Sequence, residues 1–167
     1  MTLTRLFLLC ACLFTGACAT QQNYTYRKVP GHSGLIFDGK AFPPANAPER
    51  VVEAIVAANK ICKTPYKWGG GHKQFEDNGY DCSGSAGYVL HAAGLLQSSM
   101  PSTGFRHYGE SGPGKWISIY ARTDHTFLVI ADLRFDTGYG STHGQGPRWS
   151  AEDRPAGGAV VRHPPGL

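Results

Sequence analysis

The hydrophobic residues of two segments repeat with the period of an α-helix. The first segment covers residues 46–64, and we expect Asn46 to cap its helix with Glu49 as the reciprocal partner. The helix should end by Thr64, because the proline that follows disfavours a helical conformation in the residue before it. Its apolar positions are Val51, Val52, Ile55, Val56 and Cys62. Cys62 would therefore lie on the buried face of this helix as a small hydrophobe.

The second helical segment begins directly after Asp81, whose side chain is well suited to cap a helix. Apolar residues then follow at the spacing i, i+3, i+4 and i+7: Ala86, Val89, Leu90 and Ala93. Gly94 favours the end of the helix. This pattern places Cys82 in the first helical turn.

Strand-like patterns occupy the second half of the chain. The strongest covers residues 126–131, directly after His125, and Asp132-Leu133 is a plausible tight turn before a strand over residues 134–137. Residues 116–120 and 159–162 supply further strands. With 167 residues, 22 Gly, 11 Pro, 41% hydrophobic and 17% charged residues, the chain is expected to form one loop-rich α+β domain.

The N-terminus has the pattern of a secretory signal peptide over residues 1–17. Arg5 precedes a nine-residue apolar run, which small residues follow. The run is shorter than the ~20 residues that span a bilayer, so we expect no mature transmembrane helix. Residues 15–18 resemble a bacterial lipobox, and lipid attachment to Cys18 is expected, with an ordinary signal peptide as the alternative. Ala19 after this cysteine favours, in a Gram-negative host, the outer membrane facing the periplasm.

Residues 18–44 show no sustained periodicity and are expected to form a lipidated tether and an irregular lead-in. Residues 45–167 would then be the folded domain. The net charge of +4 is small and scattered, which argues against nucleic-acid binding. Once the first three cysteines are assigned to the signal peptide and the anchor, Cys62 and Cys82 remain as possible thiols.

Cys82 has the position of a nucleophile, because unpaired N–H groups and the helix dipole favour a thiolate at the first turn. Such a cysteine needs a base, and the chain has seven histidines. His125 opens the most strand-like segment, so a rigid element would hold its imidazole. His91 lies on the helix of Cys82, about 13 Å from the thiol along the axis. His125 is therefore the preferred base.

Asp136 is the candidate for a third member of this set. If a two-residue turn joins the two strands, Asp136 projects from the same face as His125, and Thr137 from the other. There it could orient the imidazole and stabilise its protonated form. The alternative is a surface ion pair with Arg134 or Arg148.

Two motifs resemble the NlpC family of bacterial cell-wall cysteine peptidases: Tyr66-x-Trp68-Gly69-Gly70, and Asp81-Cys82-Ser83-Gly84 at the start of a helix. A histidine at the start of a strand follows them, and the resemblance covers roughly residues 46–137. It implies a papain-like α+β fold in which the nucleophile helix packs on a small antiparallel sheet. It also implies a catalytic domain over residues 45–167 that hydrolyses peptidoglycan stem peptides between D-γ-glutamate and a diamino acid, without cofactor or metal.

The resemblance makes Cys82 the nucleophile and His125 the base. Tyr66 would stand beside the thiol and help to bind substrate or the oxyanion. Asp81 and Ser83 would contact the amine of the stem peptide.

The sequence departs from the family pattern at two places near the base. The third residue is commonly a second histidine, and here that place holds Thr137 beside Asp136. Asp136, Thr137 and His143 therefore all remain candidates. Phe127 replaces a glycine that usually follows soon after the catalytic histidine, so the walls of the cleft should differ.

Other interpretations remain open. An amidase or a transferase could use the same fold, and a catalytically silent lipoprotein could bind the cell wall. A metal site would need Cys62, Cys82 and histidines, although the sequence has no Cys-x-x-Cys or His-x-x-x-His pair. The expected partners are a peptidoglycan peptide and, through the lipid anchor, a membrane, and the protein is expected to be a monomer.

Overall fold

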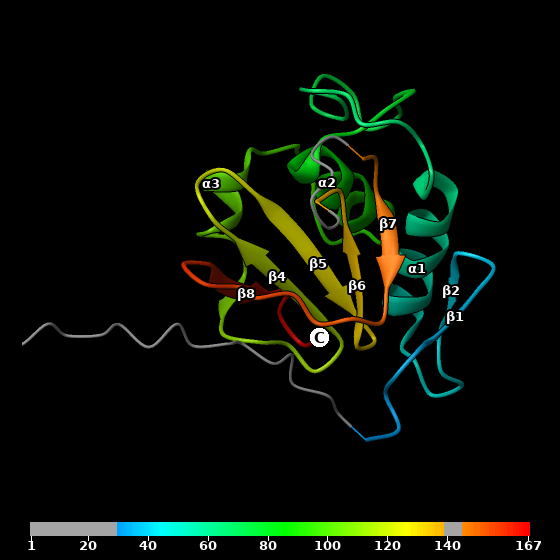
Figure 1. Cartoon of the computed structure of the whole chain (residues 1–167). Helices are drawn as coiled ribbons and strands as arrows, with labels where there is room; N and C mark the ends of the chain where they lie inside the picture. Colours follow the sequence, from blue (N-terminus) through cyan, green and yellow to red (C-terminus); the bar gives the residue numbers. More distant parts are fainter. Residues whose placement is uncertain (1–29, 139–144) are drawn as a thin grey trace, which may run out of the picture.

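The computed structural model describes residues 30–138 and 145–167. These residues form a main antiparallel sheet, helices on one of its faces and a separate hairpin (Figure 1). The helices are α1 (Glu49–Ile61), α2 (Cys82–Ala92) and α3 (Ser102–Phe105). The strands are β1 (Leu35–Phe37), β2 (Lys40–Phe42), β3 (Glu110–Ser111), β4 (Ile117–Ala121), β5 (Thr126–Ile130), β6 (Leu133–Asp136), β7 (Arg148–Ser150) and β8 (Val160–His163).

The larger sheet has six strands in the order β3-β8-β4-β5-β6-β7, and every neighbouring pair is antiparallel. Helices α1 and α2 pack against each other, and both contact β5. Ile119 of β4 and Leu128 of β5 are fully buried in the same core as Ile55 of α1 and Val89 of α2. The expected α+β fold, with α2 packed on a small antiparallel sheet, is confirmed.

Helix α1 begins later than the sequence pattern predicts. Its first residue is Glu49, behind Pro48, and Asn46 does not cap it. Pro48 disfavours the helical conformation in the residue before it, so the helix does not extend back to Asn46. The helix ends at Ile61, within the predicted limit. Cys62 lies at the C-cap and is half-buried against the core, whereas the spacing predicts a place on the buried helical face.

The segment before α1 is more ordered than predicted. Strands β1 and β2 form a hairpin, so the expectation of an irregular lead-in is wrong for residues 35–42. Asp38 and Gly39 at its turn have φ of +49° and +72°. Ala41 is buried and its backbone bonds the side chain of Asn59 in α1. Three-residue strands are too short to show alternation, although Asp-Gly is a known turn signal.

The proposed signal peptide and Cys18 lie outside the described residues, and the domain boundary at residue 45 stays a prediction. None of the helices within residues 30–138 and 145–167 combines the length and hydrophobicity needed to cross a bilayer.

The turn between β5 and β6 lies one residue earlier than predicted. Ala131 and Asp132 form it, with φ of +48° and +61°, and Ile130 pairs with Leu133. The turn still has two residues, so odd positions of β5 pair with even positions of β6 as expected. His125 and Asp136 therefore share a face as predicted, whereas Thr137, expected on the other face, follows the end of β6 and lines the same cavity as His125.

Candidate active site

Helix α2 presents Cys82 at its first turn, as the sequence predicts. Asp81 is the N-cap, and its Oδ1 atom accepts a hydrogen bond of 2.7 Å from the N–H of Gly84. Gly94, with φ of +66°, follows the end of this helix. The helix start therefore lies at the surface of the cavity in which the thiol sits.

Glycines pack closely where α2 begins. A Cβ atom on Gly84 would collide with the carbonyl oxygen of Gly70. Gly71, next in the same loop, has φ of +82°, which side chains rarely tolerate. The absence of these side chains lets the loop of residues 69–71 lie directly against the nucleophile helix.

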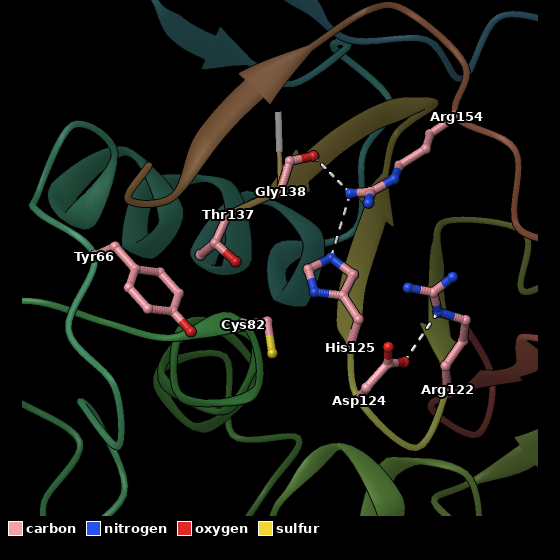
Figure 2. Close-up of a pocket in the computed structure, with 8 residues that line it drawn as sticks. All are labelled: Tyr66, Cys82, Arg122, Asp124, His125, Thr137, Gly138 and Arg154. Atoms are coloured by element: carbon pink, nitrogen blue, oxygen red, sulfur yellow. Dashed lines mark hydrogen bonds and ion pairs between the residues drawn. The ribbon is translucent and has the colours of Figure 1, made fainter. Parts of the chain in front are cut away.

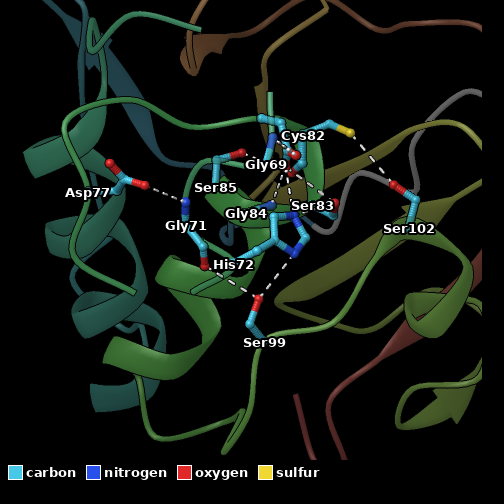
Figure 3. Close-up of polar contacts among 11 residues, drawn as sticks. Gly69, Gly71, His72, Asp77, Cys82, Ser83, Gly84, Ser85, Ser99 and Ser102 are labelled. Carbon is cyan, nitrogen blue, oxygen red and sulfur yellow. Dashed lines mark hydrogen bonds and ion pairs between the residues drawn. The ribbon is translucent and has the colours of Figure 1, made fainter. Parts of the chain in front are cut away.

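The Cys82 thiol is held in a more acidic state than an ordinary cysteine. Burial raises the pKa of Cys82, but hydrogen bonds with His125 and Ser102, together with the charge of His125, lower the pKa overall. The Sγ atom lies 3.6 Å from the hydroxyl oxygen of Ser102 (Figure 3). Ser102 is the first residue of α3.

His125 directly precedes β5, and its ring faces the cavity that holds Cys82 (Figure 2). Its Nε2 atom lies 2.8 Å from Oδ1 of Asp136. An ionised carboxylate only accepts, so Nε2 carries a proton and Nδ1 is left for the thiol. Burial lowers the pKa of His125, but the hydrogen bond with Asp136 and the contact with Cys82 outweigh this effect and raise the pKa to about 9.

Asp136 ends β6 and its side chain is fully buried. Its Oδ1 atom also accepts from the N–H of Gly138, at 2.9 Å. Burial raises the pKa of Asp136, but the hydrogen bond and charge of His125, followed by Gly138 and Arg154, lower it overall. The prediction that Asp136 shares a face with His125 is confirmed, and a solvated surface ion pair does not describe this carboxylate.

Arg154 is a member of this cluster that sequence reasoning missed. It belongs to the connection between β7 and β8, and its Nη1 atom lies 2.5 Å from Oδ2 of Asp136. An arginine in a connection without periodicity gives no signal that it meets an aspartate from another strand. Its place became visible only in the folded chain.

Two cavities meet at Cys82. The first, of about 430 Å³, is lined by Tyr66, Cys82, Arg122, Asp124, His125, Thr137, Gly138 and Arg154. The second, of about 350 Å³, is lined by Trp68, Gly69, His72, Asp81, Cys82, Ser83, Pro101, Ser102, Thr123 and Asp124. The thiol is therefore accessible between two spaces of a size that suits small peptides.

Tyr66 lies across the first cavity from His125, with its hydroxyl on the side of Cys82 (Figure 2). Burial raises the pKa of Tyr66, and the nearby Cys82 and Asp81 raise it further. Tyr66 therefore stays a neutral hydrogen-bond donor at physiological pH. The predicted proximity to the thiol is confirmed, and a role in substrate binding stays a prediction.

Asp81 and Ser83 line the second cavity and belong to a polar cluster. Figure 3 shows Ser83 and His72 of this cluster. Asp81 Oδ2 accepts from the Gly69 N–H at 3.0 Å, and His72 Nε2 lies 3.0 Å from Oδ1. Ser83 Oγ is 3.2 Å from the same His72 nitrogen. Sequence reasoning did not single out His72, because a loop histidine carries no periodic signal. Contact of Asp81 and Ser83 with a substrate amine stays a prediction.

The two other candidates for the third member are Thr137 and His143, and Thr137 is buried like its chain neighbour Asp136. Thr137 lines the first cavity together with His125, and His143 falls outside the described residues. Cys62 and Cys82 are both free thiols. Within the described residues, no group of three His, Cys, Asp or Glu side chains is arranged to hold a metal ion.

This architecture is similar to that of solved bacterial proteins. No family model and no curated protein matches the sequence. An NlpC/P60 family protein from Bacillus cereus ATCC 10987 superposes with a TM-score of 0.54 and 16% identity, over 76% of this chain. The peptidoglycan hydrolase RipB from Mycobacterium tuberculosis superposes with a TM-score of 0.53 and 21% identity, over 73% of this chain and 68% of its own.

This chain spans less than half of the Bacillus cereus protein, 45% of its length. Both likenesses are below 25% identity, so they bear on the fold. The chain has the fold of NlpC/P60 proteins, which confirms the resemblance carried by its two motifs.

Proposed function

We propose that this protein is a cysteine peptidase that hydrolyses peptidoglycan stem peptides. The observation that carries the proposal is that Cys82 and His125 meet at one cavity, while the buried carboxylate of Asp136 bonds the ring of His125. A thiol with a lowered pKa, a base beside it and a carboxylate that orients the base form a nucleophile set for acyl transfer.

The reaction begins with a thiolate on Cys82 and a proton on His125. The sulfur attacks the carbonyl carbon of the scissile amide, and the backbone N–H of Cys82 at the helix start stabilises the oxyanion. The intermediate collapses when the C–N bond breaks and the leaving amine takes the proton from His125. A thioester on Cys82 remains. His125 then takes a proton from water, whose oxygen attacks the thioester. The C–S bond breaks, the carboxylic acid product leaves, and the thiolate of Cys82 and the protonated His125 are restored.

The arrangement of the cavities favours an endopeptidase. Cys82 and Asp124 line both cavities, so a substrate centred on the thiol has room on each side of its scissile bond. The first cavity presents Arg122 and Asp124, which form an ion pair with 3.2 Å between Nε and Oδ1. Charged groups of both signs suit a stem peptide, which carries carboxylates and a free amine. The bond that we propose is the one between D-γ-glutamate and the diamino acid.

The place of action that we propose is the cell envelope. Lipid on Cys18 would anchor the chain in the outer membrane, facing the periplasm, and the lipobox-like residues 15–18 support this proposal. A bilayer anchor would keep the domain near the peptidoglycan layer.

Mass spectrometry of products tests the reaction. Incubation with muropeptides of defined stem should yield one cut, with a free carboxyl on D-glutamate and a free amine on the diamino acid. Muropeptides that lack the diamino acid serve as the control and should stay intact. Release of the whole stem peptide from the sugar would instead identify an amidase and contradict the proposed bond.

A further inference from the structure

The connection between β7 and β8 is fixed to the outer face of the sheet, the face opposite the helices. Its Ala156 is buried in a small cluster with Tyr120, Phe127 and Val129. Tyr120 and Phe127 stack with centroids 4.9 Å apart and an interplanar angle of 2°. This packing holds the connection close to the first cavity, where Arg154 is one of the lining residues.

Arg154 makes several contacts with the proposed catalytic groups. Its Nη1 atom lies 2.5 Å from Oδ2 of Asp136 and 2.5 Å from the carbonyl oxygen of Gly138. The same atom lies 3.4 Å from Nε2 of His125 (Figure 2). The guanidinium carbon stands 6.0 Å over the ring of Phe127, at a distance suited to a cation–π contact. Phe127, which replaces a usual glycine, thus forms a platform for this arginine.

The two oxygens of Asp136 have different partners. Oδ1 accepts from His125 and from the Gly138 N–H, whereas Oδ2 accepts from Arg154. The buried carboxylate therefore accepts hydrogen bonds from two cationic side chains, one on each oxygen. Because Nε2 of His125 donates to Asp136, the approach of Nη1 to Nε2 is a contact between two donors and disfavours extra positive charge on the ring.

The separate partners of the two Asp136 oxygens matter because His125 has to give up its proton and then act as a base. A carboxylate that paired with His125 alone would hold the imidazolium proton too firmly for transfer to the leaving amine. A cation on the other oxygen weakens that hold without breaking the hydrogen bond that orients the ring.

We propose that Arg154 is a positioning residue of the catalytic set: by pairing with Oδ2 of Asp136 it takes up part of the carboxylate charge, so that His125 both keeps its orientation and releases its proton. The inference rests on the proposed function for its catalytic meaning. The electrostatic relation between Arg154 and His125 is measurable without any substrate.

Other charged groups surround His125, and they are the same in the wild type and in a variant that lacks Arg154. Cys82 of α2 faces the ring, Arg122 and Asp124 lie on the β4–β5 loop, and Arg134 Nε is 4.0 Å from Asp136 Oδ2. Arg148 of β7 pairs in register with Asp136. Removal of Arg154 takes away the cation closest to Oδ2. Because Gly138 still holds Oδ1, Asp136 stays on His125 and the imidazolium becomes more stable.

The test is an NMR titration of the His125 ring in the full chain with labelled histidine, assigned by His125→Gln. Arg154→Met should raise the measured pKa of His125, on the order of one unit, and should move the alkaline limb of hydrolysis in the same direction. It should lower kcat more than it changes KM. Arg154→Lys, which keeps the charge, should restore most of the wild-type pKa.

Arg162→Met is the matched control, since Arg162 also bonds backbone carbonyls, those of Tyr108 and Gly109, away from this cluster. It should leave the pKa of His125 unchanged. If Arg154→Met does not fold, Arg154→Gln supports the same comparison with a neutral donor. An unchanged or lowered pKa of His125 would overturn the inference. A raised pKa in a chain that hydrolyses no muropeptide would support the electrostatic role and overturn the proposed function alone.

Discussion

His125 Nε2 lies 2.8 Å from Oδ1 of Asp136, and this hydrogen bond joins the residue before β5 to the last residue of β6. The two-residue turn at Ala131 and Asp132 brings them to the same face of the sheet. The bond fixes the ring with one nitrogen towards Asp136 and the other towards Cys82. Much of the chemistry that we propose depends on this relationship.

The two thiols of the folded domain should differ in reactivity. Peptide-resolved mass spectrometry after iodoacetamide treatment should show Cys82 alkylated well below pH 8.5, the ordinary thiol value, because His125 and Ser102 lower its pKa. Cys62 should react only at higher pH, since burial raises its pKa. His125→Ala should shift the alkylation profile of Cys82 to higher pH, because burial then raises the pKa of the thiol with less opposition. An unshifted profile would remove His125 as the partner of the thiol.

Asp136→Asn should lower the pH at which the pair of Cys82 and His125 loses the proton on His125. An amide keeps the shape of the side chain but not its charge, so the pKa of His125 should fall from about 9 towards its ordinary ~6.5. The protonated His125 that accompanies the thiolate is then lost at lower pH. The alkaline limb of the kcat/KM profile therefore shifts to lower pH. The maximal rate should fall on the order of tenfold or more.

Asp153→Asn is the control for this charge change, because Asp153 is exposed in the connection that carries Arg154. Asp153→Asn should leave both the alkaline limb of kcat/KM and the maximal rate unaltered. An Asp136→Asn enzyme with the wild-type alkaline limb would show that the carboxylate charge does not stabilise His125.

The sequence predicts the chemistry of this site better than its surroundings. Cys82 and His125 are recognisable because a helix cap and a strand define their positions locally, and the strand parity extends this reasoning to Asp136. Arg154 and His72 could not be found in this way, since loops without periodicity bring them to the site. Asn46 misled the prediction because Pro48, two residues later, controls where the helix starts.

Glycine at position 84 should be needed for stability. Alanine in a helix normally gains about 0.5–1 kcal/mol over glycine, but here its Cβ would collide with the carbonyl oxygen of Gly70. Gly84→Ala should therefore lower the free energy of unfolding in denaturant by roughly 1–3 kcal/mol. At Gly87 a Cβ would meet its nearest neighbours, Leu96 and Phe75, at 3.8 Å, so Gly87→Ala should be neutral or stabilising. Equal effects at both positions would contradict the close packing of the loop on α2.

Cys18→Ser should release the protein from membranes while the domain stays active. Each buried CH₂ of an attached chain contributes about 0.8 kcal/mol to anchoring, so several chains on one cysteine hold a protein firmly. Labelled palmitate should enter the wild type and not the variant, and cell fractionation should show the variant in the soluble fraction. A variant that remains wholly with the membranes, or a wild type without label, would refute lipid anchoring at this residue.

The most direct test of the central claim is hydrolysis of a muropeptide by matched cysteine variants, followed by mass spectrometry. The account predicts that Cys82→Ala removes hydrolysis completely in a folded protein, and that Cys62→Ala keeps most of the wild-type rate, because Cys62 lies at the end of α1 with a raised pKa. Hydrolysis that survives in Cys82→Ala, or that is lost equally in both folded variants, would contradict Cys82 as the nucleophile.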